Sequence, residues 1–189
     1  MLAVFVILLS AIASLINLPI GSADFRFSAG ILILISALML NKKLKPEIMG
    51  VCTGLAVVLT RVLVASINNV DMDLLSYFLE LAFYLGYVYV YRWAVIDDDQ
   101  IYQMPLVIGL SLADFGGNTL EYFIRLAFKY ESWSKASLGT LIIGAFVRSA
   151  LIILIVFLLH RILRAMGHDI PDPLVEQSPI LNPESRSKN

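Results

Sequence analysis

The stretch that decides the fold is MPLVIGLSLADFGGNTLEYFIRLAF, residues 104–128. Its apolar run is interrupted by polar or charged side chains at Asp114, Asn118, Glu121 and Arg125. Successive steps of four, three and four residues place them on one face of an α-helix. An ionised side chain at mid-bilayer costs at least ~2.5–3.5 kcal/mol on insertion scales. This face is therefore predicted to point toward protein, water or a ligand, and not toward lipid.

The composition of the whole chain is that of a membrane protein. Of its 189 residues, 59% are hydrophobic and 15% are charged, and the mean hydropathy is +0.81. A soluble domain has ~45–50% apolar and ~25% charged residues, so the excess is expected to be surface that faces the lipid bilayer. The net charge of −1 and the lack of a long basic run exclude nucleic acid as a partner.

Six apolar segments predict an all-α, polytopic integral membrane protein with six transmembrane helices. They cover residues 1–20, 27–40, 48–67, 74–96, 104–128 and 138–163. The second is shorter than the ~20 residues that a spanning helix needs, so it is expected to be short, tilted or partly re-entrant. Residues 1–166 form the predicted transmembrane domain. Residues 167–189, which are polar and proline-rich, are predicted to be a disordered cytoplasmic tail.

The loop charges predict that both termini lie in the cytoplasm. Lys42, Lys43 and Lys45 lie in one short loop, which the positive-inside rule places inside. Alternation of six spans then places the N-terminus and the C-terminus inside as well. The first segment has no Lys or Arg before its apolar stretch, so it is expected to be a retained helix and not a signal peptide. The predicted location is the cell (inner or plasma) membrane.

A second polar stripe runs along the predicted helix 74–96. It consists of Tyr77, Glu80, Tyr84, Tyr87 and Tyr91, at steps of three and four residues. One interpretation is an aromatic wall with one acid, in which Glu80 and Tyr84 contact a ligand. The other is an interfacial tyrosine belt combined with a helix-packing face.

The ionisable groups expected near mid-membrane balance in number. Three acids, Glu80, Asp114 and Glu121, accompany three arginines, Arg61, Arg125 and Arg148. Because an unpaired charge in a low dielectric is costly, a paired polar core between the third and sixth segments is expected. The partners of Arg61 and Arg148 stay open among the acids. Glu121 and Arg125, four residues apart, are interpreted as a structural pair. Asp114, Asn118 and Arg61 are candidates for ligand binding or signalling.

No motif supports catalysis or a bound metal or cofactor. The chain has no Gly-rich phosphate loop, no Gly-x-Ser-x-Gly elbow and no His-Glu-x-x-His pair. Cys52 is the one cysteine, and His160 and His168 make no ligand pattern. The protein is therefore predicted not to be an enzyme, and no cofactor is expected.

Three stretches resemble the multi-pass N-terminal membrane region of bacterial sensor histidine kinases of the GHKL type. They are Ala113–Arg125 (ADFGGNTLEYFIR), Phe25–Gly30 (FRFSAG), and Arg61 in its apolar helix. The resemblance implies a sensor of a small molecule or of the membrane state that passes a signal to a cytoplasmic kinase. Its motif residues would be Arg26, Arg61, Asp114, Asn118, Glu121 and Arg125. These 189 residues contain no phosphoacceptor helix or ATP-binding asparagine box, so the chain is expected to be a membrane fragment or a stand-alone relative. A homodimer, or a separate signalling or transport protein, would be its partner.

Two alternative functions remain at this point. The chain's size and Leu18-Pro19-Ile20-Gly21 are similar to the substrate-binding subunits of energy-coupling-factor vitamin transporters. In such a subunit Gly50, Gly54, Gly139 and Gly144 would serve docking. The other alternative is a structural partner in a larger membrane complex, in which the polar stripes are sealed ion pairs.

Overall fold

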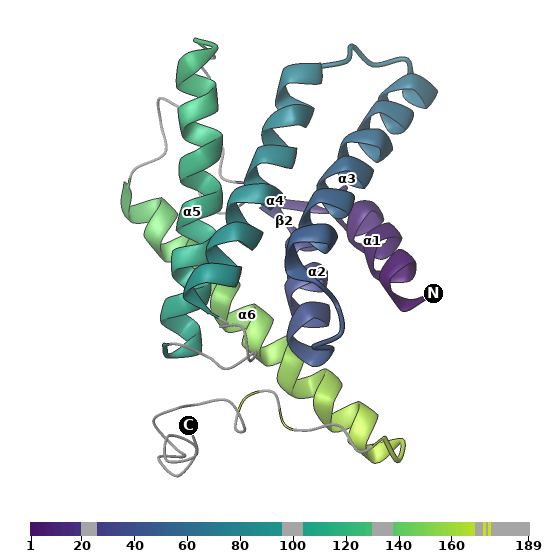
Figure 1. Cartoon of the computed structure of the whole chain (residues 1–189). Helices are drawn as coiled ribbons and strands as arrows, with labels where there is room; N and C mark the ends of the chain where they lie inside the picture. The colour runs from purple at the N-terminus through teal and green to yellow at the C-terminus, as the bar shows by residue number, and fades with distance from the viewer. Residues whose placement is uncertain (20–25, 96–103, 130–137, 169–171, 173, 175–189) are drawn as a thin grey trace.

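The computed structural model describes residues 1–19, 26–95, 104–129, 138–168, 172 and 174 (Figure 1). The helices in this part of the chain are α1 (Leu2–Ala13), α2 (Ala29–Leu40), α3 (Pro46–Asn68), α4 (Leu74–Ala94), α5 (Leu106–Ala127) and α6 (Leu138–Ala165). The predicted all-α class is confirmed for the described residues, with one short addition. Two three-residue strands, β1 (Asn17–Pro19) and β2 (Arg26–Ser28), pair antiparallel between α1 and α2.

Three helices in the described part of the chain are long and apolar enough to cross a membrane. They are α3, α4 and residues Leu141–Ala165 of α6. Their sequences explain their limits: Pro46 begins α3 at a position where its missing N–H costs nothing, and Asp73 caps α4 by accepting a hydrogen bond from the Ser76 N–H at 3.1 Å. At 22 residues α5 is also long enough, but its polar stripe makes it less apolar than these three.

The first two helices are shorter than a bilayer is thick. Each has 12 residues, which corresponds to ~18 Å at 1.5 Å per residue, against a hydrocarbon core of ~30 Å. The prediction that residues 1–20 form one spanning helix is therefore wrong, because the helix ends at Ala13. Pro19 lacks an N–H and disfavours helical geometry at Leu18, so the chain turns into β1.

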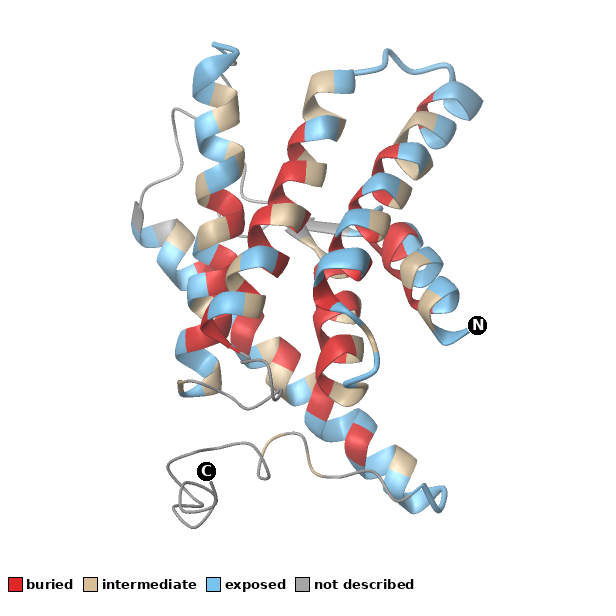
Figure 2. Cartoon of the chain, viewed as in Figure 1, coloured by how far each residue is buried: buried red, intermediate tan, exposed pale blue. Residues whose placement is uncertain are grey.

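The start of α2 lies level with the middle of α4. Tyr84 is near the midpoint of α4, and its hydroxyl lies 3.5 Å from the Ser28 Oγ at the start of α2. The helices α1 and α2 lie along one half of the bundle, where they pack on each other, on α3 and on α6 (Figure 1). Figure 2 shows the buried residues gathered mainly in this half of the molecule.

The helix α4 packs between α3 and α5, and α6 crosses α5 and α2 obliquely (Figure 1). Glycines bring α4 and α5 close together. A Cβ on Gly117 would lie 2.8 Å from the Phe83 carbonyl oxygen, and a Cβ on Gly86 would lie 3.0 Å from the Gly116 carbonyl oxygen. Close approach of the two backbones stabilises membrane helices through van der Waals packing, and larger residues at these positions would prevent it.

Replacement of Gly117 tests this contact. Gly117→Ala adds a methyl group that meets the backbone of α4, so we expect a loss of ~1–3 kcal/mol in unfolding free energy, the usual cost of overpacking. Circular dichroism during titration of the purified protein from mild detergent into SDS measures it. The matched control is Gly139→Ala at the exposed start of α6. Equal stability of the two variants would contradict the close approach of α4 and α5.

Candidate functional site

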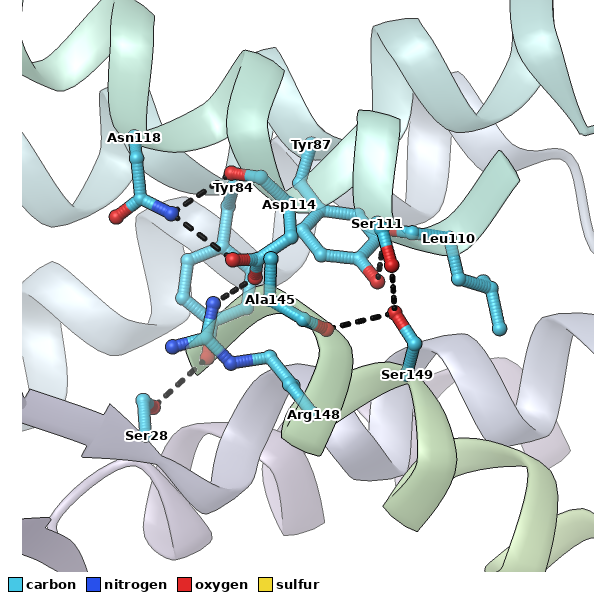
Figure 3. Close-up of polar contacts among 10 residues, drawn as sticks. All are labelled: Ser28, Tyr84, Tyr87, Leu110, Ser111, Asp114, Asn118, Ala145, Arg148 and Ser149. Atoms are coloured by element: carbon cyan, nitrogen blue, oxygen red, sulfur yellow. Dashed lines mark hydrogen bonds and ion pairs between the residues drawn. The ribbon is translucent and has the colours of Figure 1, made fainter. Parts of the chain in front are cut away.

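A buried ion pair joins α5 to α6 at the centre of the described structure. The Arg148 Nη1 donates to the Asp114 Oδ1 (Figure 3), and the relative exposures of these side chains are 2% and 0%. Asn118, one turn along α5, donates through its Nδ2 to the Asp114 Oδ2 at 3.0 Å and to the Asp114 carbonyl oxygen at 2.8 Å. The carboxylate thus has a charged partner and a neutral donor, and its position is fixed from two sides.

Aromatic rings from α4 surround this pair. The Arg148 guanidinium carbon lies 5.2 Å from the centroid of the Phe83 ring, within the range of a cation–π contact. Phe83 in turn meets Tyr84 and Tyr87 edge to face, with ring centroids 6.0 and 5.9 Å apart. We call Phe83, Tyr84, Tyr87, Asp114, Asn118 and Arg148 the central cluster.

A second polar contact between α5 and α6 lies one turn from the ion pair. The hydroxyl oxygens of Ser111 and Ser149 are 3.1 Å apart, and each lies within hydrogen-bond distance of the carbonyl four residues earlier, that of Val107 or Ala145. One of the two hydroxyls donates to the other, and the second donates to its own carbonyl. This contact holds the register of α5 against α6 without adding charge.

The second interhelical ion pair closes the end of α1. The Arg61 Nε donates to the Glu80 Oε2 at 2.6 Å, and its Nη2 donates to the Ser14 carbonyl oxygen at 3.0 Å. Ser14 is the C-cap of α1, so this carbonyl is one that the helix leaves without an internal partner. A guanidinium is well suited to this position, because it supplies several donors and a positive charge at the negative end of the helix dipole.

The third pair stays within one helix. The Arg125 Nη2 and Nε donate to the Glu121 Oε1 at 2.5 and 3.0 Å, and both side chains keep partial exposure. The predicted Glu121–Arg125 pair is present, and the structure pairs Arg61 with Glu80 and Arg148 with Asp114, two partnerships that the sequence left open. The ligand-binding or signalling roles of Asp114, Asn118, Glu80, Tyr84 and Arg61 stay predictions.

Arg26 is the one residue of the resemblance motif whose side-chain contacts are not described. Its backbone lies in β2 opposite Pro19, and its side chain lies outside the described residues, as do the acidic residues 97–99, Lys135 and most of the predicted tail. Leu174, which belongs to that tail, packs partly buried against the hydrophobic core. Among the described residues no group of His, Cys, Asp and Glu is placed to hold a metal ion.

The sequence did not single out two residues that lie at or next to the central cluster, Phe83 and Ser149. Phe83 lies one residue from the tyrosine stripe, and Ser149 follows Arg148 directly. Aromatic and small residues of this kind are frequent on all faces of membrane helices, so neither carries a signal of its own. Gly50 and Gly54, considered above for docking, lie against Val88 and Leu81 of α4, so they serve the packing of α3.

No protein-family model, no curated protein and no solved structure matches the chain.

A double-mutant cycle tests the central ion pair. Asp114→Leu or Arg148→Met alone leaves one buried charge without its partner, and we expect each to cost ~3–5 kcal/mol of unfolding free energy. The double variant leaves neither charge, so we expect it to be more stable than either single variant. SDS-induced unfolding followed by circular dichroism measures all four proteins.

The pair within α5 provides the comparison. Glu121→Gln removes an interaction between neighbours on one helix, and we expect a loss of only ~0.2–0.5 kcal/mol. Additive losses from Asp114→Leu and Arg148→Met in the double variant would contradict the pairing of these two residues.

Proposed function

We propose that the chain is a membrane sensory module in which the buried Asp114–Arg148 pair couples the interior of the bundle to the position of α6. The single observation that carries the proposal is this ion pair between α5 and α6, buried and accompanied by Asn118 and the α4 aromatic rings. A structural scaffold gains little from such a pair, because apolar residues of similar volume fill a core at equal or lower free energy.

The geometry of α6 suits an output element. It has 28 residues, or ~42 Å at 1.5 Å per residue, so it is longer than the bilayer core. It contacts α5 and α2 and leads directly to the C-terminal segment. A change in the ion pair or in α2 therefore acts on the helix that continues toward the cytoplasm in the proposed topology.

The junction between α1 and α2 suits an input element. Non-helical backbone at membrane depth is tolerated where it is buried in protein or lines a cavity, and interrupted helices of this kind form ligand sites in transporters. Here the end of α1 meets Arg61 and Glu80, and the start of α2 meets Tyr84 of the central cluster. A ligand that competes for Arg61 or Tyr84 would thereby alter the contacts of α2, and with them those of α6.

This arrangement also supports a refined topology. We infer four spanning helices, α3 to α6, and a re-entrant pair, α1 and α2, in place of six spans. A re-entrant pair returns to the side on which it entered, so both termini and the lysine-containing loop between α2 and α3 lie in the cytoplasm, as the positive-inside rule favours. The resemblance to sensor histidine kinases is consistent with this orientation, because their kinase follows the last membrane helix on the cytoplasmic side.

A sensor requires two positions of α6 that differ by a few kcal/mol, so that binding can shift the population between them. Electron–electron distance measurements test this on the full chain in lipid nanodiscs. With Cys52 replaced by Ser, spin labels at Lys43→Cys and Arg164→Cys report the distance from the α2–α3 loop to the end of α6. Asp114→Asn is expected to shift the mean distance by at least ~1–2 Å, the scale of helix shifts in switching proteins.

Two further variants make the result decisive. Glu121→Gln makes the same carboxylate-to-amide change on the same helix, at a carboxylate that pairs with Arg125 of α5, so the distance should stay at the wild-type value. Ser149→Ala perturbs the α5–α6 contact more mildly and serves if Asp114→Asn reduces the helix content. Wild-type distances in both the Asp114 and the Ser149 variants would identify a rigid structural protein and overturn the proposal.

A further inference from the structure

A groove separate from the central cluster runs along the outer side of α4. It has a volume of about 480 Å³ and is lined almost entirely by apolar groups of α3, α4 and α5, among them Val51, Leu85 and Tyr89. Tyr89 is 75% exposed, so this side of α4 faces out of the bundle. Because α3 and α4 are both candidates to cross the membrane, the groove opens toward the acyl chains of the lipid.

The groove exists because three helices contribute glycines to its floor. Gly50, Gly86 and Gly116 all line it, and each is required by packing, since a Cβ on any of them would lie 2.4–3.0 Å from a neighbouring helix. Because these three residues have no side chains, they leave a furrow between the backbones of α3, α4 and α5. The furrow is therefore a fixed property of the helix contacts.

The groove runs from the ends of α3 and α4 that meet at Glu47 and Arg92 toward the middle of the bundle. Glu47 in the first turn of α3 lies at one end, and its Oε1 is 3.2 Å from the Arg92 Nε in the last turn of α4. Gly116 and Leu120, near the middle of α5, mark the deeper part. Trp93, next to Arg92, is 71% exposed, as expected of an aromatic residue at the headgroup level.

We propose that this groove binds one phospholipid with a zwitterionic, ammonium-bearing headgroup, of which phosphatidylethanolamine is the test case. One acyl chain lies in the apolar furrow, and the headgroup lies at the Glu47–Arg92 pair. The ammonium complements the Glu47 carboxylate, whose side chain is 55% exposed, and the phosphate complements the Arg92 guanidinium, at 29%. A choline headgroup has no N–H to donate and a glycerol headgroup has no cation, so both should bind more weakly. This site does not depend on the sensory proposal.

Native mass spectrometry of the full chain tests the site. The delipidated protein in detergent is mixed with equal amounts of phosphatidylethanolamine, phosphatidylcholine and phosphatidylglycerol. We expect a single phosphatidylethanolamine adduct, retained about tenfold more than either competitor.

Val51→Phe fills the groove and should abolish the adduct. Leu55→Phe, one turn further on α3, is 47% exposed in the wild type and outside the groove, and should keep it. Glu47→Gln should keep binding but lose the preference over phosphatidylcholine.

Three results would overturn the proposal. They are equal retention of the three lipids by the wild type, undiminished phosphatidylethanolamine binding by Val51→Phe, and a dimer in place of the lipid adduct. The last would assign the groove to a second copy of the chain. Circular dichroism of each variant confirms its helix content, and Leu55→Phe controls for the effect of a phenylalanine on α3.

Discussion

The high free energy of an unpaired charge in a low dielectric is the constraint on which the rest of the structure depends. Glu80, Asp114 and Glu121 lie within apolar helices, and each lies within ion-pair distance of an arginine. The Asp114–Arg148 pair sets the contact of α5 with α6, and the Glu80–Arg61 pair sets that of α3 with α4. Because each pair between helices has to be shielded from lipid, these pairs determine which helix faces point inward.

Close helix packing makes this shielding possible. Glycines on α3, α4 and α5 let the three backbones approach, which brings Phe83, Tyr84 and Tyr87 against the central pair. The same glycines leave a furrow on the lipid side of α4. The two short helices then close one half of the bundle, and their junction meets α3 and α4 through Arg61 and Tyr84. One set of small residues thus shapes both the buried centre and the outer groove.

Much of this arrangement can be predicted from the sequence. The bounds predicted for α3 to α6 agree with the structure to within two residues, because each is a long apolar run between polar loops. The inward faces of α4 and α5 follow from steps of three and four residues. The end of α1 does not follow from hydropathy, because apolar residues continue to Ile20, although Asn17-Leu18-Pro19 is a turn signal. The partner of Arg61 is not predictable either. Three acids are chemically equivalent candidates, and only the packing of α3 on α4 selects Glu80.

The most direct test of the account is the distance between the Asp114 carboxylate and the Arg148 guanidinium in a lipid bilayer. Solid-state nuclear magnetic resonance with ¹³C-labelled aspartate and ¹⁵N-labelled arginine measures it through dipolar dephasing, and Arg148→Lys assigns the signal. The account predicts dephasing that corresponds to an ion pair, with nitrogen and oxygen within ~4 Å, and its loss in Arg148→Lys. A spectrum that Arg148→Lys leaves unchanged would show that the central pair does not exist in the membrane.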